Sequence, residues 1–240
     1  MASIIRPSNK IRQQCRWHPY PSTLTLEHAA AQAIFQSAQS AISQRGAFHL
    51  VLAGGNTPQR VYELLTNLET NWEAWHIYFG DERCLPAENE ARNSAMATNA
   101  LLRHVSIPQH QIHIIPAENG AEAAASAYAQ TLKKVEIFDL VLLGLGEDGH
   151  TASLFPGHAW GVEVDAPATL AILDAPKPPA QRVSLSASRL SKTRQLIFLV
   201  SGDAKALAIR SWRDGNEIPA AAIAPECGVD TYLEETLLST

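Results

Sequence analysis

Short, mainly apolar runs alternate along the chain with longer segments of helical period. The runs are five or six residues long, too short for helices, and they lack the alternation of a half-buried strand. They lie at 48–53, 75–79, 138–143 and 195–200. Continuous apolar runs of this kind are typical of strands that are covered on both faces. The pattern therefore predicts an α/β fold in which helices cover both faces of a mostly parallel, doubly wound sheet.

Helices are expected in the segments between these runs. In the longest segment, apolar residues recur near the 3.6-residue period, Thr23 or Thr25 could cap its start, and Gly46 ends it. Further helices are expected at 58–68, 91–103, 121–134, 203–212 and 229–238. Additional short strands are expected at 15–18, 112–115 and 182–186. The proline-rich stretch 155–180 is expected to be mostly loop, with one apolar segment at 170–173.

Length, charge and cysteine content limit the number of domains, the class of partner and the cellular compartment that we expect. A chain of 240 residues fits one α/β domain over 1–240, with 1–21 as an N-terminal extension or edge strand. The net charge of −5 and the absence of a basic block argue against a nucleic-acid partner. Three scattered cysteines indicate a reducing compartment. With no bilayer-length apolar run and no signal peptide at the start, we expect a cytoplasmic enzyme that does not contact membranes.

Four of the expected strands end in residues suited to binding or catalysis. In a parallel sheet the carboxyl ends of all strands lie at one edge, which is where ligands bind in open α/β folds. Four distant segments are therefore expected to meet at one cleft. They are 54–58, 80–83, 144–150 and 202–205.

The loop after the strand at 138–143 holds an acid and an imidazole two residues apart. Asp148 and His150 are flanked by Gly146 and Gly149, which make the backbone compliant. An imidazole has an ordinary pKa near 6.5 and can accept a proton from water at neutral pH. Asp148 could orient the histidine or the substrate, or could instead bond backbone N–H groups. We interpret His150 and Asp148 as the catalytic residues.

A second loop is suited to an anion. Gly54, Gly55, Asn56 and Thr57 precede an expected helix, whose exposed N–H groups and dipole attract a phosphate. The alternative is a tight turn without a ligand. The loop lacks the spacing of a nucleotide-binding P-loop, so the expected ligand is a different phosphate compound.

Two cations follow other strand ends. Arg83 and Lys205 each come after a glycine-containing turn, and both residue types bind phosphate. The alternative for each is an ordinary solvated charge. Asp81 and Glu82 precede Arg83; one of them could bond sugar hydroxyls while the other pairs with Arg83, and the sequence does not decide between them.

Other chemistries fit the chain less well. The segment 144–149 matches G-x-G-x-x-G after a strand, but an acid lies inside it and prolines follow, which disfavours a dinucleotide site. His110 and His113 are close in sequence but lack a cysteine pair, and there is no H-E-x-x-H motif. No G-x-S-x-G nucleophile elbow occurs. We therefore expect neither a metal site nor a dinucleotide site.

Taken together, these segments resemble the glucosamine-6-phosphate isomerase/6-phosphogluconolactonase family. The likeness extends in the family's order over about 50–215, and the long motif around His150 is its most specific part. Pro86 and Asn93 also match. The segments that carry the resemblance are 53–58, 80–83, 144–157, 182–186 and 198–205.

The resemblance implies a Rossmann-like sheet and the hydrolysis of 6-phospho-D-glucono-1,5-lactone in the oxidative pentose phosphate pathway, without a cofactor. It implies that His150 is the general base and that Arg83 and Lys205 contact the phosphate. Arg182, which lies in one of the matching segments, is also expected among the substrate-binding residues. The chain departs from the family pattern at Asn56 and at Arg92, each where Ser is usual, and its tail lacks a Trp-Asp ending. These departures concern the phosphate loop and the C-terminal packing.

Two alternatives remain beside the lactonase. Aminosugar-phosphate deaminases/isomerases are similar around Asp148 and His150 but place an acid shortly after the histidine, where this chain has Phe155. A non-catalytic sugar-phosphate sensor would be fused to a DNA-binding module, which the residues before the first long helix are too few to form. The expected partner is thus a small sugar-phosphate lactone, bound by a monomer or homodimer.

Overall fold

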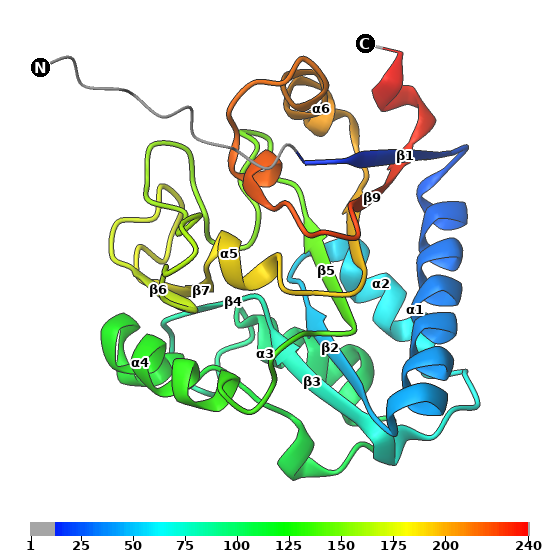
Figure 1. Cartoon of the computed structure of the whole chain (residues 1–240), viewed down its shortest axis with the longest axis vertical. Helices are drawn as coiled ribbons and strands as arrows, with labels where there is room; N and C mark the ends of the chain where they lie inside the picture. Colours follow the sequence, from blue (N-terminus) through cyan, green and yellow to red (C-terminus); the bar gives the residue numbers. More distant parts are fainter. Residues whose placement is uncertain (1–12, 240) are drawn as a thin grey trace, which may run out of the picture.

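A six-stranded parallel sheet forms the centre of the molecule in a computed structural model that describes residues 13–239 (Figure 1). The strand order is β1-β9-β8-β5-β2-β3, and every neighbouring pair is parallel. The predicted fold class is therefore confirmed. The strands are β1 (Cys15–Tyr20), β2 (Phe48–Leu52), β3 (Trp75–Phe79), β5 (Leu140–Gly144), β8 (Leu196–Val200) and β9 (Val229–Glu234).

The strand order reverses beside the middle of the sheet. From β2 the chain goes outward to β3, then crosses back so that β5, β8 and β9 follow on the other side of β2. The boundary between β2 and β5 is thus a topological switch point, where the loops after two adjacent strands diverge and leave a crevice. The loops that diverge here are the two glycine-rich segments singled out in the sequence.

Helices flank the sheet on both sides (Figure 1). The longest, α1 (Thr23–Arg45), is capped by Ser22, whose hydroxyl accepts from the Thr25 N–H while Thr25 bonds back to Ser22. The cap is therefore Ser22 and not either threonine. Gly46 ends the helix with a φ of 79°, as expected of a left-handed C-terminal residue. The other helices are α2 (Asn56–Leu65), α3 (Asn93–Ala97), α4 (Ala121–Leu132), α5 (Ala187–Leu190) and α6 (Ala206–Arg213).

A second, smaller sheet was not anticipated. It is antiparallel, in the order β4 (Asp81–Arg83), β7 (Arg182–Leu185) and β6 (Thr169–Ile172), and α4 packs against it. Only Gly80 separates β3 from β4, and its carbonyl accepts from the Leu185 N–H at 2.8 Å. This sheet forms a side wall at the carboxyl end of the main sheet.

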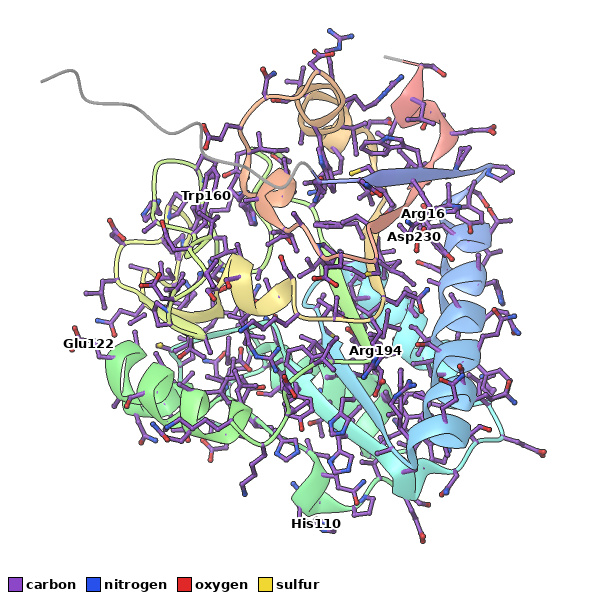
Figure 2. All side chains as sticks on the ribbon, viewed as in Figure 1. Arg16, His110, Glu122, Trp160, Arg194 and Asp230 are labelled. Carbon is purple, nitrogen blue, oxygen red and sulfur yellow. The ribbon has the colours of Figure 1, made fainter. Side chains whose placement is uncertain are left out.

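The prediction of a helix at 229–238 is wrong. Residues 229–234 are the strand β9, in which Val229, Thr231 and Leu233 are buried and alternate with less buried residues. β9 lies between β1 and β8, and Arg16 of β1 binds Asp230 of β9 through two nitrogens at 2.7 and 3.0 Å (Figure 2). Because β9 is paired with β1 and β8, alternate residues of 229–234 are buried, which is the two-residue period of a strand and not the period of a helix.

Two further predictions change in detail. Segment 112–115 makes a single bridge from Ile112 to Ile77 and is not a strand, and the helix predicted at 91–103 is α3 followed by one π-helical turn, Thr98–Leu102. The remaining short helices are 3-10 turns at Trp72–Ala74, Gln109–Gln111, Ala117–Asn119, Asp203–Lys205, Pro219–Ala222 and Glu235–Leu238. The expected absence of a signal peptide concerns residues outside the described range. Among residues 13–239, no helix has both the length and the apolarity to cross a membrane.

Candidate active site

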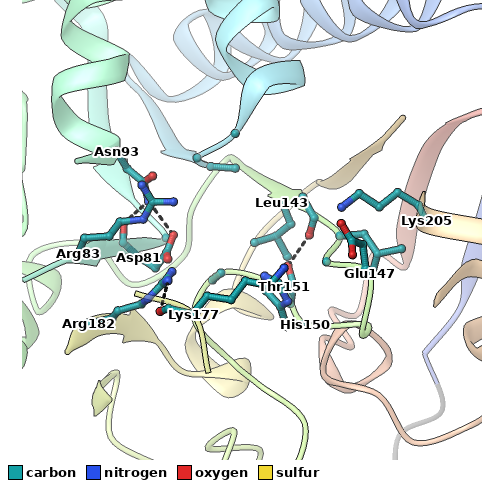
Figure 3. Close-up of a pocket in the computed structure, with 18 residues that line it drawn as sticks. Asp81, Arg83, Asn93, Leu143, Glu147, His150, Thr151, Lys177, Arg182 and Lys205 are labelled. Carbon is teal, nitrogen blue, oxygen red and sulfur yellow. Dashed lines mark hydrogen bonds between the residues drawn. The ribbon is translucent and has the colours of Figure 1, made fainter. Parts of the chain in front are cut away.

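A pocket of about 200 Å³ opens at the carboxyl ends of β2, β3 and β5, directly at the switch point (Figure 3). This volume lies below the roughly 300–1,000 Å³ of sites for drug-sized ligands, so it suits a small metabolite. Most of the residues predicted for the site line this pocket. They are Gly54, Gly55, Asp81, Arg83, His150, Arg182 and Lys205.

His150 is placed by a tightly bonded loop after β5. Its carbonyl accepts from the Gly146 N–H at 2.7 Å, and the neighbouring Thr151 hydroxyl donates to the Gly144 carbonyl at 2.8 Å. Gly149 has a φ of +84° and packs against Ile218, so a side chain there would be strained and crowded. The loop therefore presents the imidazole, whose side chain is 21% exposed, to the pocket.

Asp148 fixes the orientation of the imidazole from outside the pocket lining. Its Oδ1 lies 2.5 Å from His150 Nδ1 and also accepts from the His150 backbone N–H at 3.1 Å. Partial burial would raise the pKa of Asp148, but these bonds outweigh it and hold the pKa below its usual value. An ionised Asp148 keeps the proton on Nδ1, so Nε2 is left as the basic nitrogen.

Two neighbours fix the ring on its other sides. A Cβ at Gly146 would lie 2.0 Å from His150 Nδ1, so only glycine leaves room for the ring at this position. The buried Phe155 ring lies 4.9 Å from the imidazole, centroid to centroid. Phe155 itself carries no group that can transfer a proton.

Asp81 is a buried carboxylate at the opposite wall. Its Oδ2 accepts from the Ser153 hydroxyl at 2.6 Å and its Oδ1 from the Asn93 amide at 2.9 Å. Asn93 lies so close to the glycine loop that a Cβ at Gly54 would come within 2.1 Å of its Oδ1. Asn93 also lines the pocket; the residue pattern alone did not mark it, and only the family motif had included it.

Glu82, the other acid of the pair, is structural. It is fully buried and accepts from the backbone N–H groups of Arg83, Asn93 and Ser94 at 2.8–2.9 Å. Arg92 stands at the N-cap position of α3, and its guanidinium cannot accept a hydrogen bond, so Glu82 caps the start of the helix instead. Asp81 thus faces the pocket, whereas Glu82 supports the backbone and pairs with Arg92 and not with the Arg83 side chain.

Replacing Glu82 by alanine is expected to lower the free energy of unfolding by about 3–5 kcal/mol. The Arg92 guanidinium lies 3.5 Å from Glu82 in a buried ion pair, and it would be left with one carboxylate partner, Glu118. Urea unfolding measures the change. Glu90→Ala, an exposed glutamate of the same segment, is the matched control and should shift stability little. A loss below about 1 kcal/mol for Glu82→Ala would contradict this role.

The glycine loop is held against the β8 loop. Gly55 is the N-cap of α2 with a φ of 110°, and Thr57 bonds Ser201 between side-chain oxygens at 2.6 Å. Ser201 begins the segment that leads to Lys205, so this bond holds the helix start and that cation together. Asn56 and Thr57 themselves do not line the pocket, although both were predicted as binding residues.

Within residues 13–239, four cationic side chains line the pocket, and one of them, Lys177, was not predicted. Arg83 and Lys205 reach it from opposite sides, with His150 between them (Figure 3). Arg83 donates through Nη1 to the Ala91 carbonyl. Arg182 is buried and donates to backbone carbonyls at 177–179. Lys177 and its neighbour prolines lie a few residues before β7, in a stretch for which the sequence predicted only a proline-rich loop.

No three His, Cys, Asp or Glu side chains of residues 13–239 gather as metal ligands would. The expectation of a reaction without metal or organic cofactor stays a prediction.

Comparisons with known proteins give one consistent result. A 6-phosphogluconolactonase of Mycobacterium leprae is 32% identical over 231 residues, which cover 89% of this chain and 92% of the relative. One from Synechocystis sp. is 36% identical over 200 residues, covering 78% and 81%. The solved structure of 6-phosphogluconolactonase from Trypanosoma brucei superposes with a TM-score of 0.81 at 26% identity, covering 95% of this chain and 98% of that one.

The sequence profile of the family described as glucosamine-6-phosphate isomerases/6-phosphogluconolactonase matches residues 21–232. This range contains all of the motifs that meet at the pocket. The chain therefore belongs to the glucosamine-6-phosphate isomerase/6-phosphogluconolactonase family.

Proposed function

We propose that this protein hydrolyses 6-phospho-D-glucono-1,5-lactone to 6-phospho-D-gluconate, a reaction of the oxidative pentose phosphate pathway, with His150 as general base. The observation that carries the proposal is the shared pocket: the Asp148-oriented imidazole opens onto the same small cavity as a helix N-terminus and two cations. A small substrate that carries both a phosphate and an ester needs an anion-binding site and a general base in the same pocket.

The phosphate is proposed to bind at the glycine loop. Backbone N–H groups at Gly54 and Gly55 and the positive end of the α2 dipole favour an anion. Lys205, tied to this loop through the Thr57–Ser201 bond, and Arg83 from the opposite side supply positive charge. Binding of this remote group orients the lactone ring, so that binding energy serves positioning at the reacting carbon.

His150 is proposed to act through Nε2. It takes a proton from a water molecule, and the water oxygen forms a bond to the lactone carbonyl carbon while the carbonyl electron pair moves to oxygen. Collapse of the tetrahedral intermediate breaks the bond to the ring oxygen, which takes the proton back from His150. Asp148, kept ionised by its bonds to His150, stabilises the imidazolium formed between these steps.

The decisive experiment is a hydrolysis assay on freshly generated 6-phosphogluconolactone, with the spontaneous reaction subtracted and phosphate-free gluconolactone in parallel. We expect rapid turnover of the phosphorylated lactone. Parallel incubation with glucosamine 6-phosphate tests the deaminase alternative, and no ammonia is expected, since Phe155 stands where an acid would be needed. Binding of the lactone without turnover would favour the sensor and refute the lactonase.

Replacing Lys205 by alanine is expected to lower kcat/KM for the phosphorylated lactone roughly 10- to 100-fold, the value of a charge-assisted hydrogen bond. The same variant should leave the phosphate-free lactone nearly unaffected, because the lost ammonium acts on the phosphate. Steady-state kinetics on both substrates measure the difference. Lys133→Ala, an exposed lysine at the end of α4, is the matched control. Equal losses on both substrates would refute the phosphate role.

We further propose one domain over the whole chain and a monomer or homodimer that acts on this small molecule, without nucleic-acid contact. Size-exclusion chromatography with light scattering distinguishes the two oligomeric states.

A further inference from the structure

We propose that the Lys177 ammonium binds the carbonyl oxygen of the lactone and stabilises the oxyanion formed during hydrolysis, and that Arg182 positions the Lys177 loop without touching the substrate. The inference deepens the proposed function and rests on it. It supplies the group that the reaction still lacks, a positive charge beside the carbonyl that His150-activated water attacks.

Arg182 donates to its own chain from two of its three guanidinium nitrogens. Its Nη2 donates to the Lys177 carbonyl at 2.9 Å and to the Pro178 carbonyl at 3.4 Å, and its Nε donates to the Pro179 carbonyl at 3.2 Å. The residue is only 7% exposed, and its guanidinium lies over the Phe155 ring, 5.5 Å from the centroid. A guanidinium that donates to three successive backbone carbonyls holds the loop at 177–179 in place. We therefore assign Arg182 a positioning role in place of the predicted contact with the substrate.

The Lys177 loop is fixed relative to the imidazole by packing. Ala175 forms a small buried cluster with Phe155 and Ile172, and its N–H donates to the Ala180 carbonyl at 2.9 Å. Phe155 contacts the His150 ring on one side and the Arg182 guanidinium on another. The base, the aromatic ring and the loop thus form one packed unit, so the start of the Lys177 side chain is held at a set place beside His150.

The side chain itself runs across the pocket toward Thr151 and His150 (Figure 3). Within residues 13–239 its ammonium is engaged in neither a hydrogen bond nor an ion pair with the protein. Arg83 and Lys205 enter the pocket from its two sides, away from the point at which Lys177 ends (Figure 3). Lys177 therefore extends into the His150 side of the pocket, where we place the carbonyl that the base-activated water attacks.

The chemistry requires a donor at this point. As water adds to the carbonyl carbon, the π electron pair moves to the carbonyl oxygen, and a full negative charge develops on an atom within one bond of the attacked carbon. A lysine ammonium is a compact charge with three donors and binds a single oxygen well, whereas the fork of an arginine suits two oxygens. When the ring C–O bond breaks, the charge moves to the ring oxygen and is neutralised by the proton from His150.

Replacing Lys177 by alanine or glutamine is expected to lower kcat about 10²- to 10³-fold, the loss typical of an oxyanion donor, while KM for the phosphorylated lactone changes little. Because the ammonium acts on the lactone and not on the phosphate, kcat/KM for phosphate-free gluconolactone should fall by a similar factor. Lys205→Ala serves as the contrast, since its loss is confined to the phosphorylated substrate. Lys177→Arg should recover part of kcat.

Each other outcome overturns the proposal. A raised KM for the phosphorylated lactone, with phosphate-free turnover unchanged, would make Lys177 a phosphate ligand. Normal turnover of both lactones would make it an exposed surface charge. If the unaltered protein fails to hydrolyse either lactone, the proposed function fails; if it hydrolyses them and Lys177→Ala does as well, only this inference fails.

The role of Arg182 is tested by its dependence on Lys177. Arg182→Lys keeps the charge but loses the fork, and it should lower kcat in the unaltered protein but not in a Lys177→Ala background. Thermal unfolding is followed for each variant, because a merely structural role would lower stability and activity in both backgrounds alike. A further loss of kcat in the double variant would show that Arg182 does not act through Lys177.

Discussion

Replacing His150 by alanine is expected to lower kcat for 6-phosphogluconolactone about 10²- to 10⁴-fold, the usual contribution of a general base. Among residues 13–239 no other imidazole lines the pocket, so the variant loses the proposed base. The affinity for the product should stay nearly the same, because the ring contributes to proton transfer and not to the phosphate site. Steady-state kinetics on freshly made lactone, with the spontaneous rate subtracted, measure the loss, and calorimetric titration with 6-phosphogluconate measures the affinity.

Asp148→Asn is the companion variant for His150→Ala. The amide keeps the size of the side chain but no longer favours the proton on Nδ1, so part of the population carries the wrong tautomer and kcat should fall less than in His150→Ala. His158→Ala is the matched control, because this histidine pairs with Asp174 outside the pocket and should be dispensable. Turnover of His150→Ala within threefold of the unaltered protein would end the general-base mechanism.

The sheet and the catalytic loop were predictable for a physical reason. Strands covered on both faces appear in the sequence as continuous apolar runs, and β2, β3, β5 and β8 all coincide with such runs. Parallel strands also place their carboxyl ends at one edge, so residues that follow β2 and β5 could be brought together without any knowledge of the tertiary contacts.

The parts that were missed depend on distant partners. β9 is a strand because β1 and β8 offer it hydrogen bonds on both sides, and its own residues fit a helix as well in isolation. The small sheet forms because Gly80 leads β4 into contact with β7, about a hundred residues later along the chain. Lys177 lines the pocket from a loop bonded by Arg182 of β7, and the local sequence pattern could not reveal this placement.

One departure from the family pattern has a structural compensation. Arg92 stands at the N-cap of α3, where a serine would itself accept from the helix N–H groups. Here Glu82 accepts from the N–H groups of Asn93 and Ser94, while Arg92 turns inward and donates to Glu118 and to the Ile115 carbonyl. The capping group is thus supplied by Glu82 of β4 instead of the N-cap residue, and Asn93 still lies beside the pocket.

Gly146→Ala is expected to lower kcat as far as His150→Ala does, about 10²- to 10⁴-fold, although it removes no functional group. A Cβ at this position would lie 2.0 Å from His150 Nδ1 and 2.2 Å from Cε1, well inside contact distance. The backbone carries no positive φ at Gly146, so the chain itself accepts alanine there and the ring is what must move. A displaced ring loses the 2.5 Å bond to Asp148, and with it the tautomer that leaves Nε2 basic.

Gly144→Ala, two residues earlier at the end of β5, separates this effect from a general intolerance of side chains. The nearest atom to its Cβ would be the Gly54 carbonyl oxygen at 3.9 Å, an ordinary contact, so the loss should be at least tenfold smaller than for Gly146→Ala. Steady-state kinetics on both variants, with the histidine ring signals followed by NMR, test whether displacement of the imidazole accompanies the loss. Full activity in Gly146→Ala would mean that the ring need not lie where Asp148 holds it, and the proposed catalytic geometry would then be wrong.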